Sequence, residues 1–198
     1  LSTIEEVLTT LTTAEFNDAL KRNRSAFLFR GLPNVSYKLT TSLRWNCKGK
    51  AGELEPSILR NFSKYAASTS PLNSCWEQMV IGQHHGLPTR LMDWTYSPLA
   101  ALHFATSGED ITGMNQHDAV VWAIDITEMN TLLPAKYQKV LNDERAYLFT
   151  IDMLDRVAKD LTTYDNDMGE DGIVLLEPPS IDQRIINQYS YFSVIPAN

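Results

Sequence analysis

The densest group of residues able to do chemistry lies in the middle of the chain, at residues 83–95. His84 and His85 precede a Gly-x-Pro turn, and Arg90 and Asp93 follow three residues apart. Imidazole, guanidinium and carboxylate groups supply hydrogen bonds, charge and proton transfer, so this spacing predicts a polar binding site. The site residues predicted here and just beyond are Gln83, His84, His85, Thr89, Arg90, Asp93, Trp94, Thr95 and Ser97.

A second candidate is the triplet Phe29-Arg30-Gly31, which lies in the apolar run 26–32. An Arg on a strand beside phenylalanines is costly to bury unless its guanidinium finds an anion. One interpretation is an internal carboxylate, with Asp93 the obvious partner, and the residues alone favour it slightly. The other is a ligand phosphate or carboxylate, to which Arg offers bidentate donors. Gly31 would let a ligand or a neighbouring strand approach the backbone closely.

The charge of the chain is uneven, although the formal net charge is −7 and the pI is near 5.0. Residues 19–52 contain eight Lys and Arg residues and no acid, while residues 108–198 are strongly acidic. A basic stretch of this kind favours an anionic ligand through its local field, and Arg44 within it is a predicted ligand contact. The alternative is a solvated basic face that neutralises the acidic second half.

Several other classes of site and protein are disfavoured. Adjacent histidines on a helix point about 100° apart and cannot converge on one metal ion, and residues 165–172 lack the order of a calcium loop. The chain has no nucleophile elbow, phosphate-binding loop or dinucleotide fingerprint. No window is long and apolar enough to span a bilayer, so no membrane partner is expected. Two cysteines without metal spacing suggest reduced thiols and a cytoplasmic setting.

The patterning predicts helices and strands that must position these residues. Helices are expected at 2–23, after Pro56, from Ser74 to Gly86, after Ser97, at 127–141 and after Ser180. Strands are expected at 26–32, 37–43 (a weak pairing partner of the first), 119–126, 147–151, 173–177 and 190–195, with 89–95 extended or loop. Helices gather early and strands late, which predicts a single α+β domain over 1–198 with a mixed or largely antiparallel sheet. The chain begins without Met, and we interpret it as a piece of a longer protein with other domains.

Phe29-Arg30-Gly31, residues 41–44 and residues 83–105 together resemble the FRG domain family, which is named after its Phe-Arg-Gly triplet. Residues 184–192 are similar to the closing motif of that family, with Ser190 where a glycine is common. The similarity spans about residues 20–195. The family is largely uncharacterised, so the resemblance implies a fold more than a chemistry.

A looser resemblance is to the arrangement of ADP-ribosyltransferases: an Arg on an early strand, a Ser or Thr strand leading into a helix, and a late acidic residue. It implies that Arg30 holds the phosphates or ribose of NAD. It also implies that Thr95 or Ser97 is the Ser or Thr residue of that arrangement. Gln188 would stand near the usual glutamate, and Arg184 belongs to the implied ligand-binding set. A neutral Gln188 cannot stabilise an oxocarbenium-like ribose as a carboxylate does, which implies weak or altered transfer. Glu177 would be the substitute if the fold brought it near.

We therefore expect a cleft that binds a nucleotide-like anion such as NAD, with ADP-ribosyl transfer or NAD hydrolysis as the chemistry and no cofactor required. A first alternative is a nucleic-acid binder that uses the basic stretch, with Phe27, Phe29, Tyr37 and Trp45 available for stacking; the low pI argues against it. A second alternative is an interaction module whose motif residues are structural.

Overall fold

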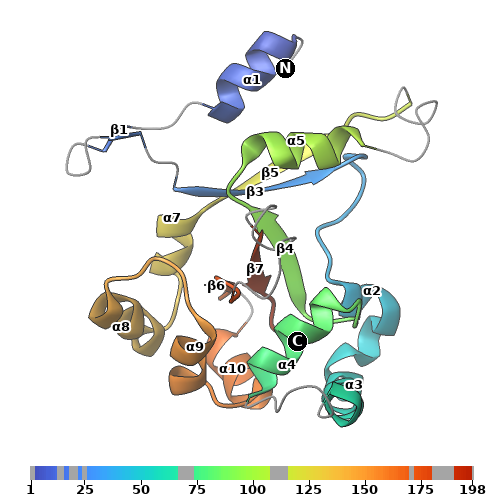
Figure 1. Cartoon of the computed structure of the whole chain (residues 1–198), viewed down its shortest axis with the longest axis vertical. Coiled ribbons are helices and arrows are strands. Elements are labelled where there is room, and N and C mark those ends of the chain that lie inside the picture. Colours follow the sequence, from blue (N-terminus) through green and yellow to red (C-terminus); the bar gives the residue numbers. More distant parts are fainter. Residues whose placement is uncertain are drawn as a thin grey trace.

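The structure is a computed structural model of the chain, and it describes residues 3–12, 16–17, 22–23, 26–66, 74–107, 116–169, 172–179 and 190–197. Its centre is a five-stranded sheet in the order β5-β3-β4-β7-β6, in which all neighbouring strands run antiparallel. Helices flank this sheet (Figure 1). The predicted α+β class with a largely antiparallel sheet is confirmed.

The strands of this sheet pair unevenly. They are β3 (Phe27–Leu32), β4 (Leu91–Thr95), β5 (Val120–Asp125), β6 (Val174–Leu176) and β7 (Ser190–Val194). β3 pairs with β5, and β4 with β7, along their whole lengths. β3 and β4 share only the partner pair Phe29 and Thr95, and in Figure 1 β3 runs across the end of β4 rather than beside it. The sheet therefore opens between β3 and β4, next to Arg30.

The helices form two groups around the sheet. α5 (Pro98–Thr106) lies across β3 and β5 at one end of the molecule, and α1 (Ile4–Thr12) lies beyond it (Figure 1). The other group gathers at the opposite end, around β4, β7 and β6. It consists of α2 (Ser42–Cys47), η1 (Lys48–Lys50), α3 (Ala51–Ala66), α4 (Cys75–His84), α8 (Ala135–Glu144), α9 (Ile151–Val157) and α10 (Leu161–Met168). α7 (Ile126–Thr131) directly follows β5.

The local start and stop signals around the middle motif are confirmed. The Ser74 hydroxyl accepts a hydrogen bond from the Glu77 backbone N–H and begins α4, and Gly86 follows that helix with φ +81°. Ser97 caps α5 in the same way, with Pro98 at the first helical position. The predicted strands at 26–32, 119–126, 173–177 and 190–195 are also present, and the 89–95 segment forms β4.

Several expected elements of the first half differ. The helix predicted over 2–23 ends at Thr12, and β1 (Phe16–Asn17) then pairs with β2 (Arg22–Asn23). Residues 37–43 form no strand, because the Thr41 hydroxyl accepts from the Arg44 N–H and begins α2 there. α3 begins at Ala51, five residues before Pro56, so that proline lies inside the helix instead of in its first turn.

The second half contains more helix than expected. The helix predicted at 127–141 is two helices, α7 and α8, with Pro134 between them. The strand predicted at 147–151 is reduced to a single parallel bridge between Phe149 and Leu176, and α9 and α10 occupy the acidic segment after it. β5, the strand predicted at 119–126, is the edge strand of the sheet and is partly exposed. The helix predicted after Ser180 lies outside the described residues.

Two apolar clusters fix the sheet. The larger packs α4, α8, α9 and α10 against β6 and β7, around Trp76, Tyr137 and Tyr164. The smaller joins β3, β4, β6 and α7 through Leu28, Met92, Trp94, Ile126 and Leu175. Burying this much apolar surface stabilises the strands and gives β4 a rigid base. Cys47 and Cys75 are both free thiols, and no helix in the described segments is long and apolar enough to cross a bilayer.

Candidate functional site

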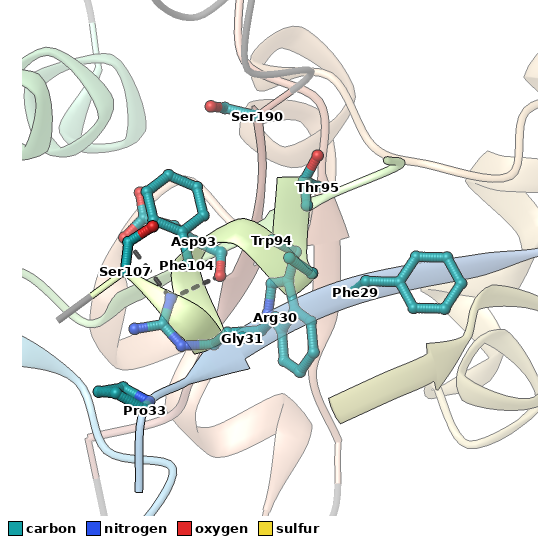
Figure 2. A pocket seen from close by; sticks show the side chains of 11 residues that line it. Phe29, Arg30, Gly31, Pro33, Asp93, Trp94, Thr95, Phe104, Ser107 and Ser190 are labelled. Atoms are coloured by element: carbon teal, nitrogen blue, oxygen red, sulfur yellow. Dashed lines mark hydrogen bonds and ion pairs between the residues drawn. The ribbon is translucent and has the colours of Figure 1, made fainter. Parts of the chain in front are cut away.

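A cavity of about 370 Å³ lies where β3 and β4 separate beneath α5 (Figure 2). Its walls come from Phe29, Arg30 and Gly31 on β3, from Asp93, Trp94 and Thr95 on β4, and from Ala101, Phe104 and Ser107 on or after α5. Pro33 and Ser190 complete the lining. The volume is within the range of about 300–1,000 Å³ that is usual for small-molecule sites, near its lower end. Both segments that the sequence singled out therefore meet at one open cavity.

Gly31 determines how closely α5 approaches the sheet. A Cβ atom at this position would lie 1.8 Å from the main-chain oxygen of Ala101 and 2.7 Å from the Ala105 nitrogen. Ala101 and Ala105 are themselves small and buried, so the helix backbone rests directly on β3. The close approach expected at Gly31 is thus made by a helix rather than by a ligand or a strand.

Arg30 bridges the opening between the two strands. Its Nη1 donates a hydrogen bond of 2.6 Å to the main-chain oxygen of Asp93 and lies 3.9 Å from the Asp93 carboxylate. The side chain is 27% exposed, and burial lowers the pKa of Arg30 while Asp93 raises it in part. A guanidinium has five donors. Within the described residues its partner is Asp93, and the guanidinium also lines the cavity.

Asp93 is held by a relay of side chains from the same motif. Its Oδ2 accepts a hydrogen bond of 3.1 Å from Gln83 Nε2, and Gln83 Oε1 accepts one of 2.6 Å from the Thr89 hydroxyl. Thr89 is buried and its oxygen also accepts from the Leu91 N–H. The Asp93 side chain is 56% exposed at the rim of the cavity. Three residues predicted from the sequence, Gln83, Thr89 and Asp93, therefore act as one unit.

The floor of the cavity is mostly structural. Trp94 is buried, and its indole N–H donates to the Ser193 hydroxyl at 2.9 Å. Thr95 is 6% exposed, and its hydroxyl oxygen accepts from the Ser97 N–H. Ser97 in turn caps α5 by accepting from Ala100, so it positions the helix and is not a lining residue.

Comparison with protein families identifies the segment that contains this cavity. Residues 25–112 match the family model of the FRG domain. This match assigns that segment, and not the rest of the chain, to the FRG domain. The match runs from β3 through α5, so the FRG segment supplies every lining residue of the cavity except Ser190. No curated protein and no solved structure matches the chain. The predicted closing motif at 184–192 lies outside the matched range and stays a prediction.

Arg90, a predicted ligand contact, instead joins the FRG segment to α10 in the interior of the protein. It is 2% exposed, and its guanidinium bonds the carboxylates of Glu55 on α3 and Asp165 on α10. Burial opposes the charged form, but hydrogen bonds and charge from Glu55 and Asp165 raise the pKa of Arg90 above its ordinary value. Asp165 also accepts from the backbone N–H of Ala197 near the end of the chain. Arg90 is therefore a structural clamp, because both of its anionic partners are internal.

The remaining predicted residues of the FRG domain do not line the cavity. Arg44 lies on α2, where its Nη2 donates to the main-chain oxygen of Pro196 at 3.1 Å. His84 and His85 end α4 with their ring centroids 5.3 Å apart, and His85 faces Phe62. In the segments that the structure describes, no three His, Cys, Asp or Glu residues gather as a metal site would require.

The late positions implied by the ADP-ribosyltransferase resemblance are placed only in part. Gln188 and Arg184 lie outside the described residues. Glu177 lines a different cavity of about 460 Å³, together with Glu77, Asp152 and Asp155. Burial there raises the pKa of Asp155, and the charges of Asp152 and Glu77 add to the effect. Glu177 is thus not a lining residue of the Arg30 cavity.

Sequence reasoning missed the contribution of α5 to the site. Phe104 and Ser107 face the cavity from the end of that helix. Phe104 lies one turn after Ala101 on α5, and Ser107 directly follows the end of the helix. The signal that could have found them was the pair of small residues, Ala101 and Ala105, on a helix close to a strand glycine.

Proposed function

We propose that the FRG domain binds a nucleotide-type ligand in the β3–β4–α5 cavity, and that NAD fits this site best. One observation carries the proposal: Arg30 and Asp93 lie side by side in an open cavity with their charged groups 3.9 Å apart. A purely anionic ligand would be attracted by the guanidinium and repelled by the carboxylate. NAD has an anionic pyrophosphate and a cationic nicotinamide ring, so each of its charges would find an opposite partner.

The surroundings of Arg30 support an anion in that position. Partial burial lowers the pKa of Arg30, which reports that its guanidinium has lost part of its hydration. A less hydrated guanidinium in a lower dielectric binds phosphate oxygens more strongly than an exposed one does. Phe104 and Phe29 give the cavity apolar walls against which a ring can pack. The volume favours the nicotinamide riboside and adjoining phosphate, with the adenosine at the mouth.

The proposed chemistry is cleavage of the bond between nicotinamide and ribose, followed by transfer of ADP-ribose to water or to an acceptor group. Arg30 would hold the phosphate, as the ADP-ribosyltransferase resemblance implies. Thr95, which forms the partner pair of β3 and β4 with Phe29, would hold the ribose close to Arg30. Gln188 keeps its proposed role as a hydrogen-bonding group for a ribose hydroxyl.

The binding part of the proposal is tested by isothermal titration of NAD into the wild type, Arg30→Lys and Arg30→Met. We expect Arg30→Lys to weaken binding about 10-fold, since it keeps the charge but loses the bidentate geometry, and Arg30→Met to abolish it. The control is Arg60→Met, which removes an exposed Arg on α3 that lines no part of this cavity. Undetectable binding to the wild type, or equal affinity in folded Arg30→Met, contradicts the proposal.

A second candidate function, binding of single-stranded nucleic acid, is favoured by the surface of α2 and η1. Trp45 is 74% exposed there, and Arg44, Lys48 and Lys50 are its neighbours in the chain. Exposed aromatic side chains among cations stack bases and attract phosphates. Fluorescence anisotropy with a labelled single-stranded oligonucleotide tests this function, and binding should weaken steeply with added salt. No binding at low salt excludes it.

A further inference from the structure

We infer that Asp93 is the carboxylate that stabilises the ribosyl cation as nicotinamide leaves, and that Gln83 positions it. The inference rests on the NAD site proposed above and deepens it by naming a catalytic residue. The ADP-ribosyltransferase resemblance assigns Asp93 no such role, because it expects the acidic group late in the chain.

The reaction requires a negative charge near the ribose. The bond between ribose C1 and the nicotinamide nitrogen breaks with its electron pair going to nitrogen, so nicotinamide leaves neutral. The positive charge then rests on C1 and the ring oxygen of the ribose. A fixed carboxylate beside that charge stabilises the transition state. Water attacks C1 to form ADP-ribose and gives up one proton, which passes through the carboxylate to solvent.

Asp93 is the group placed to supply this charge. Among the described residues that line the cavity, no other side chain is a carboxylate. Glu177 lies against the separate acidic cavity, and the residue implied at the late position, Gln188, is neutral. The distance of 3.9 Å between Arg30 Nη1 and Asp93 Oδ2 is too long for a hydrogen bond, so the carboxylate is not neutralised by a tight ion pair. At 56% exposure it stays accessible from the cavity.

The relay behind Asp93 has a defined direction. The ionised Asp93 carboxylate can only accept, so the NH2 group of Gln83 faces it. The amide oxygen of Gln83 then faces Thr89 and accepts its hydroxyl hydrogen, while the Thr89 oxygen accepts from Leu91. Gln83 thus presents a donor to the carboxylate and holds its oxygen in place. Thr89 is 1% exposed, so the far end of the relay is anchored in the interior.

The charge of Asp93 can be removed without releasing Arg30. Arg30 donates its 2.6 Å hydrogen bond to the main-chain oxygen of residue 93, which every substitution retains. Asp93→Asn keeps the shape of the side chain and can still bond Gln83 through its amide oxygen. This variant therefore separates the role of the negative charge from the integrity of the opening between β3 and β4.

The test measures NAD affinity by titration and nicotinamide release by chromatography for the wild type, Asp93→Asn and Asp93→Glu. We expect Asp93→Asn to lower kcat about 10²- to 10³-fold, with Kd weakened less than about 10-fold since Asp93 also faces the cationic ring in the ground state. Asp93→Glu should recover part of the rate. Asp143→Asn, an exposed carboxylate paired with Lys139 on α8, is the matched control and should behave as the wild type.

The positioning role of Gln83 is tested by a double-mutant cycle. Gln83→Met should lower kcat about 10-fold in the wild type and have no further effect in Asp93→Asn, because that variant lacks the negative charge that Gln83 positions. Equal effects of Gln83→Met in both backgrounds would refute the relay. Nicotinamide release by Asp93→Asn at the wild-type rate, or equal losses in kcat and affinity, would overturn the role of Asp93 while the NAD site stands. Absence of NAD binding or release by the wild type would overturn the proposed function itself, and this inference with it.

Discussion

Replacing Gly31 with alanine tests the packing that forms the cavity. The added Cβ would lie 1.8 Å from the Ala101 oxygen and 2.7 Å from the Ala105 nitrogen, whereas real Cβ atoms essentially never come within 3.0 Å of such atoms. Both are main-chain atoms of α5, so no side chain can rotate away. The helix must move from β3 by more than an ångström or the strand must bend.

The expected cost of Gly31→Ala follows from that geometry. Overpacking a well-packed interface costs about 1–3 kcal/mol, and a clash with a helix backbone belongs at the upper end of this range. For a chain of this length 1 kcal/mol corresponds to about 2–4 °C in Tm, so we expect Tm to fall by about 6–12 °C. NAD binding should weaken as well, because α5 carries Phe104 and Ser107 into the cavity.

Differential scanning calorimetry and urea unfolding measure the effect of Gly31→Ala, and Gly49→Ala is the matched control. A Cβ at Gly49 would meet nothing within 4 Å, so we expect its free energy of unfolding to change by less than about 0.5 kcal/mol. Gly31→Ala unfolding at the same temperature and urea concentration as Gly49→Ala would refute the account of this glycine.

Three further predictions concern other parts of the chain. Glu55→Gln should destabilise the fold by about 3–5 kcal/mol in urea unfolding, because it leaves the buried Arg90 short of an anionic partner; a cost no larger than that of Arg156→Met, which breaks an exposed pair, would contradict this clamp. Burial, with nearby aspartates, raises the pKa of Cys75 from 9.0 to about 12, so its thiolate fraction at pH 8 falls about 1,000-fold. Alkylation followed by mass spectrometry should therefore be far slower for native Cys75 than for the urea-unfolded chain, and equal rates would disprove the shift. Trp45→Ala should weaken oligonucleotide binding by about 1–3 kcal/mol if α2 stacks a base, and unchanged anisotropy would exclude that surface.

The elements that could be predicted from the sequence are those with local signals. Ser74 with Glu77, and Ser97 with Pro98, determine helix starts through hydrogen bonds and backbone angles confined to a few residues. The strand at 26–32 could be predicted in the same way, because apolar β-formers end at a glycine. These local signals placed the Phe29-Arg30-Gly31 triplet on a strand and residues 83–95 between two helices. The structure brings residues of both segments to one cavity.

The parts that the sequence could not predict depend on contacts between distant segments. Arg90 and Asp93 look equally available for a ligand in the sequence, yet Arg90 meets Glu55 and Asp165, which lie 35 and 75 residues away. Tertiary packing decides such cases over local preference. The end of the first helix at Thr12 and the helix in place of a strand after Thr41 have nearer causes, the pairing of β1 with β2 and the Thr41 cap, which residue periodicity alone does not encode.

The central claim is that the opening between β3 and β4 holds NAD with its phosphate on Arg30 and its ribose beside Asp93. A crystal structure of the protein with a non-cleavable carbocyclic analogue of NAD tests it most directly. We expect a phosphate oxygen within hydrogen-bonding distance of the Arg30 guanidinium and the nicotinamide riboside between Asp93 and Phe104. An empty cavity at saturating analogue, or analogue bound elsewhere on the protein, would contradict it.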